Sequence, residues 1–309
     1  MMLRCLTLLL MLGACASAPA PVAPAAQVAA PAPCPAAESL SALGDERARG
    51  EAILDMDQPS REALAKALLP CLGDPDPALR DGVAYTSLSQ MMRGELIGAE
   101  TVAELQADLL DMLLDAEDPT GFTAPFAALV LAEVARTDRI SPWMDDDGRS
   151  ALITAAHEYL EDLTDYRGFS DTDGWRHGVA HTGDLLMQLS LNPHLTRPQA
   201  EAILAAIALK AGPADHAYVF GESERLAAPV MYLARREMFS EAEWTDWFTS
   251  LWPAEDPLRE DVYASEAALA KLHNLKAFSQ AIYVSAKASN DAAYEPVGRA
   301  AFTLLNSLP

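Results

Sequence analysis

Apolar residues recur every three or four positions from about residue 37 to the end of the chain, and no stretch alternates apolar with polar residues. This spacing places the apolar side chains along one stripe of a helix, whereas alternation would indicate a strand. Helix starts are also marked, for example by Asp76 before Pro77 and by Ser240 three residues before Glu243. Helices are therefore predicted over about residues 37–55, 59–72, 77–94, 99–115, 122–138, 147–164, 174–191, 196–211, 222–238, 240–252, 257–286 and 290–307.

The links between these segments are short, which favours neighbouring helices that pack against each other. We therefore predict an all-α chain that forms a single array of stacked helical hairpins, a HEAT-like α-solenoid. The Asp-rich runs 145–148 and 171–174 lack the ligand spacing of a calcium loop, so each is interpreted as the start of a helix.

The first 37 residues differ in composition from the rest. Arg4 precedes an apolar run over residues 5–12, which is too short to span a bilayer and is typical of a secretory signal. The run ends in Leu12-Gly13-Ala14-Cys15, which is similar to the bacterial lipobox and implies cleavage before Cys15 and lipid on its thiol. Proline recurs in the stretch that follows, which prevents helix formation. The predicted organisation is a signal peptide over 1–14, an acylated cysteine and flexible tether over 15–37, and a helical domain over 38–309.

Lipid on Cys15 would anchor the chain to a membrane. Ala16 after the cysteine is typical of lipoproteins sent to the outer membrane, so we expect a domain that faces the periplasm. An ordinary cleaved signal peptide with an incidental cysteine is the alternative. Cys34 and Cys71 then remain as an even pair in an oxidising compartment, and a disulfide between them is predicted.

The formal net charge of −23 argues against a nucleic acid as partner, because the phosphate backbone would be repelled. The charge is compatible with a metal ion or a cationic ligand, and also with a role in solubility alone.

One short sequence occurs twice. Residues 80–86 read RDGVAYT and residues 176–182 read RHGVAHT, which agree at five of seven positions. Such self-similarity indicates a repeat. Asp81 would then correspond to His177, and Tyr85 to His181. Equivalent positions on the inner helices of a curved array line one concave surface, so we predict a groove there.

His177, His181 and Asp184 are spaced by four and three residues and would share one face of a helix. Two histidines one turn apart can bind a zinc ion, with Asp184 orienting His181 and a third ligand from Asp81, Glu222 or Glu224. The alternative is a pair of hydrogen-bonded structural histidines.

The run Gly174-Trp175-Arg176-His177-Gly178-Val179-Ala180-His181, followed by Asp184 and by Glu224-Arg225-Leu226-Ala227, resembles the bacterial family "domain of unknown function 2785". The likeness covers roughly residues 60–290. It implies an all-helical array in which Trp175, His177, His181 and Asp184 are a shared feature, and it implies no reaction.

The sequence thus favours a lipid-anchored binding or scaffold protein. Its ligand, a protein or peptide, would lie in a groove lined by Asp81, Tyr85, Trp175, His177, His181, Asp184 and Arg225. No complete catalytic set is visible. The alternative is a metal-assisted hydrolase with His177 and His181 as metal ligands.

Overall fold

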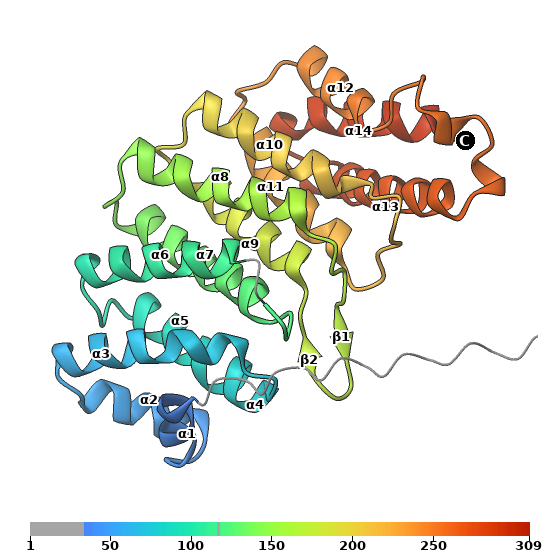
Figure 1. Cartoon of the computed structure of the whole chain (residues 1–309). Coiled ribbons are helices and arrows are strands. Elements are labelled where there is room, and N and C mark those ends of the chain that lie inside the picture. Colours follow the sequence, from blue (N-terminus) through green and yellow to red (C-terminus); the bar gives the residue numbers. More distant parts are fainter. Residues whose placement is uncertain (1–33, 116–117) are drawn as a thin grey trace, which may run out of the picture.

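The computed structural model describes residues 34–115 and 118–309. This part of the chain is almost entirely helical, which confirms the predicted all-α class (Figure 1). The signal peptide, Cys15 and most of the tether lie outside the described residues. The helices are α1 (Pro35–Ser41), α2 (Glu46–Asp55), α3 (Gln58–Leu68), α4 (Pro77–Leu79), α5 (Thr86–Arg93), α6 (Ala99–Leu114), α7 (Thr123–Ile140), α8 (Asp146–Asp162), α9 (Gly178–Leu191), α10 (Arg197–Ala211), α11 (Glu222–Ala234), α12 (Glu241–Ser250), α13 (Glu266–Ser289) and α14 (Glu295–Ser307).

Shorter elements complete the array. A π-helical turn, η2 (Arg80–Tyr85), joins α4 to α5, and two strands, β1 (Phe169–Ser170) and β2 (Gly174–Trp175), form an antiparallel hairpin. Turns of 3₁₀ helix cover Leu69–Gly73, Pro257–Arg259, Val262–Ala264 and Ala292–Tyr294.

Within the described residues, no helix is both long enough and apolar enough to cross a membrane.

The helices pack in two layers that follow the order of the chain (Figure 1). Helices α5, α7, α9, α11 and α13 pack side by side in a first layer. Helices α6, α8 and α10 form a second layer against it, and α12 and α14 close the C-terminal end. The side of the first layer that the second layer leaves uncovered is called the open face below. On α9 only Asp184, Met187, Gln188 and Leu191 remain partly accessible beyond the first turn, and their spacing places them on this face.

The centre of the array depends on small residues, which let the helices approach closely. Helix α7 contributes buried alanines at positions 124, 127, 128, 132 and 135. On α9, a Cβ added to Gly183 would lie 3.1 Å from the backbone oxygen of Arg225 on α11. Pro229 has no N–H to bond that oxygen within the helix, so α11 is locally open where α9 meets it. Gly183 is therefore a contact point between neighbouring helices.

The two glycines of the repeated sequence differ in their surroundings. A Cβ on Gly178 would lie 2.5 Å from the Tyr159 hydroxyl, so α9 packs closely against α8 at this glycine. A Cβ on Gly82 would meet nothing nearer than the Pro77 backbone oxygen at 3.9 Å, so this glycine is not at a close contact between helices.

The predicted helix over 174–191 starts four residues late. Gly174 and His177 both have positive φ angles, 72° and 60°, which interrupt a right-handed helix. The backbone N–H groups of Arg176 and His177 instead donate to the carbonyls of Gly168 and Arg167. Residues 171–174 therefore form the tip of a hairpin and not a helix start. At 145–148 the prediction is confirmed, because Asp145 accepts a hydrogen bond from Gly148 N as the N-cap of α8.

Two other predicted helices also differ from the structure. The segment 37–55 is divided by a turn at Gly44, whose φ is 118°. The segment 257–286 becomes helical only at Glu266 and then continues to Ser289.

The two arginines of the repeated sequence anchor the hairpin to the array. The guanidinium carbon of Arg80 lies 3.8 Å from the centre of the Phe122 ring, and that of Arg176 lies 4.0 Å from it. Arg80 is fully buried and donates to the carbonyls of Asp74 and Asp173, which joins the start of η2 to the hairpin. The first arginine of each copy of the repeat therefore packs on the same Phe122 ring, although the two copies adopt different local structures.

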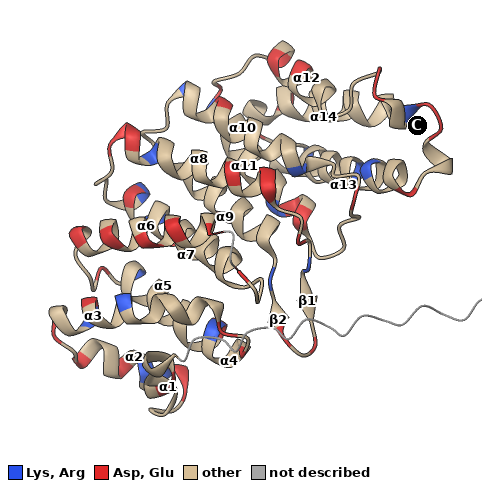
Figure 2. Cartoon of the chain, in the orientation of Figure 1, with Lys and Arg blue, Asp and Glu red and all other residues tan. Residues whose placement is uncertain are grey.

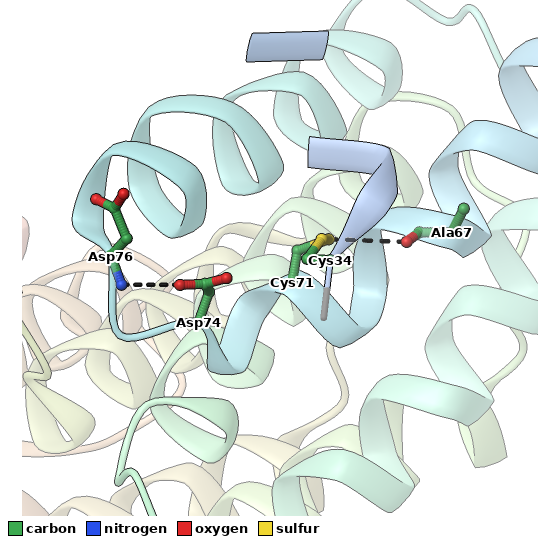
Figure 3. The surroundings of a disulfide bond; sticks show 5 residues. All are labelled: Cys34, Ala67, Cys71, Asp74 and Asp76. Atoms are coloured by element: carbon green, nitrogen blue, oxygen red, sulfur yellow. Dashed lines mark hydrogen bonds between the residues drawn. A yellow bond between two sulfur atoms is a disulfide. The ribbon is translucent and has the colours of Figure 1, made fainter. Parts of the chain in front are cut away.

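Cys34 and Cys71 form a disulfide, with a Cα–Cα distance of 5.3 Å (Figure 3). Both cysteines are buried, and the bond connects the start of α1 to the turn after α3. Asp74, in the same turn, accepts a hydrogen bond from Asp76 N at 2.8 Å. A bond that closes a loop of this length is expected to stabilise the fold by about 3–4 kcal/mol.

The close contact at Gly183 predicts opposite effects for two glycine substitutions. Gly183→Ala would force α9 away from the backbone of α11 and lower the free energy of unfolding by about 1–3 kcal/mol. Gly82→Ala fills open space in a helical segment and is expected to raise it by about 0.4–1 kcal/mol. Urea unfolding of both variants measures the difference. A Gly183→Ala protein as stable as the wild type would refute the proposed contact.

Candidate functional site

A row of polar side chains crosses the open face at its centre. Tyr85 comes from η2, which leads into α5, while Glu133 comes from α7, Asp184 from α9 and Arg225 from α11. Helices α5, α7, α9 and α11 are neighbours in the first layer. The Tyr85 hydroxyl donates to Glu133 Oε1 at 3.4 Å. Arg225 Nη1 donates to both oxygens of Asp184, at 2.6 and 2.5 Å. We call these four residues, with Arg93 at the end of α5, the central row.

The acids of the central row lie beneath the arginines. The side chain of Glu133 is 7% exposed, and that of its partner Arg93 is 54% exposed. Likewise, the side chain of Asp184 is 16% exposed, whereas that of its partner Arg225 is 50% exposed. Arg93 Nε donates to Glu133 Oε2 at 2.8 Å, so the buried Glu133 and the partly buried Asp184 each have a more exposed guanidinium beside them. Each guanidinium has more N–H donors than its carboxylate uses, and these remain available at the surface.

Burial and mutual repulsion shift the pKa values of this row. Burial raises the pKa of Asp184, with the negative charge of Glu133 adding to the rise and Arg225 opposing it. Burial also raises the pKa of Tyr85 to about 12, reinforced by Glu133. The Tyr85 hydroxyl is therefore protonated at neutral pH, and its O–H donates a hydrogen bond to Glu133.

An aromatic and histidine cluster adjoins the row at the start of α9. The Trp175 ring stacks on His177 with centroids 4.7 Å apart, and the His177 ring lies 5.8 Å from that of His181. His181 Nδ1 is 3.1 Å from the carbonyl of Pro125, to which it donates. Among the described residues no group forms a hydrogen bond with the buried His177 Nε2, which lies 3.8 Å from Glu222 Oε1.

Both histidines are held neutral. Burial lowers the pKa of His181 to about 3, with His177 adding to the decrease. Burial also lowers the pKa of His177, and Glu222 opposes this. The charge of Arg225 lowers both values, so the histidine cluster and the central row share one electrostatic environment.

The metal hypothesis required a different geometry. His177 caps α9 in a left-handed conformation, so the two histidines do not have the regular helical spacing that the prediction assumed, although their rings lie 5.8 Å apart. Asp184 is paired with Arg225, so the prediction that it orients His181 is wrong. Residues 34–115 and 118–309 contain no group of three or more His, Cys, Asp or Glu side chains arranged to hold a metal ion.

The structure separates the predicted groove residues into three places. Tyr85, Asp184 and Arg225 meet in the central row, while Trp175, His177 and His181 form the adjoining cluster. Asp81 is in neither group, because its carboxylate pairs with Arg80 Nε at 2.7 Å. The expected equivalence of Asp81 and His177 is therefore wrong. One is inside a π-helical turn, and the other precedes a helix.

Glu133 and Arg93 were not predicted from the sequence. A signal for Glu133 was present, because it is the one charged residue between Thr123 and Ala135 in an otherwise apolar helix. A charge on the buried stripe of a helix needs a partner, which here is Arg93.

These features define a two-layered all-α array with a row of buried acids and exposed arginines across its open face. The chain belongs to the DUF2785 family, whose model, described as "Protein of unknown function (DUF2785)", matches residues 109–284. The match contains Glu133, the histidine cluster, Asp184 and Arg225. It begins after Tyr85, so it is narrower than the resemblance expected over 60–290. No curated protein and no solved structure matches the chain.

The low pKa of His181 predicts a pH-dependent stability. Between its usual value of 6.5 and about 3, the unfolded chain binds a proton that folded His181 does not. The free energy of unfolding is therefore expected to fall as the pH decreases below 6.5. In His181→Asn, which keeps a side-chain N–H for the Pro125 carbonyl, the slope between pH 6 and 4.5 should be smaller by up to about 1.4 kcal/mol per pH unit.

Denaturant unfolding at several pH values measures this slope. His157→Asn, on α8, is the matched control and should retain the wild-type slope. An unchanged slope in His181→Asn would show that His181 is not buried in its neutral form.

Proposed function

We propose that this chain is a lipid-anchored binding protein of the bacterial cell envelope, and that its open face binds an extended protein or peptide ligand. The observation that carries the proposal is the central row. Stability alone does not account for it, since replacing half-buried ion pairs with apolar side chains is often neutral or stabilising. A binding surface does account for it, because arginine N–H groups left free by Glu133 and Asp184 can bond a ligand.

An apolar groove on the C-terminal half of the array supports an extended ligand. A cavity of about 660 Å³ lies between α11 and α13. Its lining is mainly apolar and includes Ala228, Met231, Tyr232, Ala281 and Val284. Val284 is 62% exposed. Because α11 also carries Arg225, a ligand that spans several helices would meet both charged and apolar surface. Helical arrays commonly bind extended ligands across successive helices.

The location in the envelope is supported by the sequence before residue 38 and by the disulfide. The Leu12–Cys15 tetrad follows an apolar run, and the proline-rich stretch after it can extend at most roughly 3 Å per residue. A disulfide between Cys34 and Cys71 is typical of an oxidising compartment. An anchored chain of this kind would hold the binding face clear of the membrane.

Lipid attachment is tested with two cysteine variants of the full chain. In Cys15→Ala, incorporation of a palmitate analogue should be lost, and the chain should leave the membrane fraction. Cys5→Ala is the matched control and should retain both properties, because Cys5 is removed with the signal peptide. Labelling of Cys15→Ala at the wild-type level would contradict the anchor.

Binding at the open face is tested by photo-crosslinking in cells that produce the full chain. A benzoylphenylalanine at position 187 of α9 lies on the open face, and one at position 209 of α10 lies on the second layer, where Leu209 is 36% exposed. We expect a discrete crosslinked species from position 187 only, and its loss in an Asp184→Asn/Arg225→Gln background. Equal crosslinking from both positions, or a species unaffected by the background, would contradict the proposal.

A further inference from the structure

A second group of polar side chains lies on the open face, toward the C-terminal end of α7. Arg136 and Arg139 are three residues apart on that helix and therefore adjacent on its surface. Arg139 Nε donates to Gln188 Oε1 on α9 at 3.0 Å. Burial and the charge of Arg136 lower the pKa of Arg139, and Tyr232 on α11 opposes this electrostatically. Three successive helices of the first layer thus contribute to the group.

The two arginines of this pair differ from Arg93 and Arg225 in their partners. In the part of the chain that the structure describes, no carboxylate forms an ion pair with Arg136 or Arg139, and Arg136 makes no side-chain hydrogen bond. Acids are plentiful, since the chain has 45 Asp and Glu residues against 22 Lys and Arg (Figure 2). In the central row, by contrast, Arg93 and Arg225 are both paired. Two adjacent, partly buried cations without an acid destabilise each other.

The free hydrogen-bonding groups here are donors. Arg136 has an unused guanidinium, and Arg139 uses only Nε in the bond to Gln188. The Gln188 oxygen is occupied by that bond, so the amide N–H groups of Gln188 are the donors that it can offer to a ligand. A cavity of about 260 Å³ reaches Arg136 from the side of α5 and is also lined by Arg93 and Glu95. Arg139 is not part of its lining, so the donors shared with α9 lie outside this cavity.

We propose that Arg136 and Arg139, with Gln188 and Tyr232, form an oxyanion site that binds a phosphate or carboxylate group of the ligand. Guanidinium groups bond both kinds of oxyanion through paired N–H donors. The chain as a whole repels anions, so attraction must arise locally, where neither arginine forms an ion pair with an acid of the described residues. The proposal rests on the binding function of the open face, and it names the chemistry of one group that the ligand presents.

The test is thermal unfolding of the full chain in detergent, with inorganic phosphate or citrate as the probe and sodium chloride at equal ionic strength as the reference. A probe at ten times its dissociation constant should raise the unfolding midpoint by about 2–4 °C. Arg136→Gln/Arg139→Gln should lose this shift. Arg47→Gln/Lys66→Gln, which removes the same charge from α2 and α3, should retain it. Without any probe, Arg136→Gln alone should raise the midpoint, because it relieves the repulsion of Arg139.

The two probes also distinguish the two sources of the oxyanion. A shift with phosphate only assigns a phosphoryl group, and a shift with citrate only assigns a carboxylate. No shift with either, or a shift that persists in the Arg136→Gln/Arg139→Gln protein, overturns the oxyanion site. If no oxyanion shifts the midpoint but position 187 still crosslinks, the open face binds a ligand without this site. If neither the midpoint shift nor the crosslink is observed, the proposed binding function is also wrong.

Discussion

The close approach of α9 to its two neighbours determines most of what this structure presents to solvent. Gly183 lets α9 approach the backbone of α11, and the buried alanines of α7 take up little space at the centre of the array. Acids on these helices are thereby drawn into a partly dry environment, where each needs a cation nearby. Glu133 and Asp184 obtain theirs from α5 and α11, on either side. The central row is thus a consequence of helix packing, and it places two arginines at the surface.

The hairpin adds a second consequence of packing. Arg80 and Arg176 both lie over Phe122, and Arg80 also bonds the hairpin carbonyl of Asp173. These contacts hold β2 against the start of α9, so that Trp175 stacks on His177. The result is an aromatic cluster with neutral histidines beside a charged row. A ligand that crosses this face would meet apolar, aromatic and cationic surface in succession, which favours a binding role over a single reaction centre.

Local sequence patterns were sufficient for the class of fold. Apolar periodicity and N-cap residues such as Asp145 act within one turn of helix, so they could be read without knowledge of the tertiary structure. The failures have nonlocal causes. Residues 171–174 resemble a helix start, but the backbone around His177 bonds to Arg167 and Gly168 instead. In the same way Asp184 is one turn from His181, yet its partner Arg225 is 41 residues away. Residue types identified the candidates, whereas their pairing depended on how the helices pack.

The central claim is that the open face of the first layer holds a ligand through the central row. Native mass spectrometry tests this most directly, with the full chain released from membranes in mild detergent and compared with its Asp184→Asn/Arg225→Gln variant. We expect a noncovalent adduct of constant mass on the wild-type protein and none on the variant, with both proteins folded. An adduct of equal mass and abundance on both proteins, or none on the wild type, would contradict it.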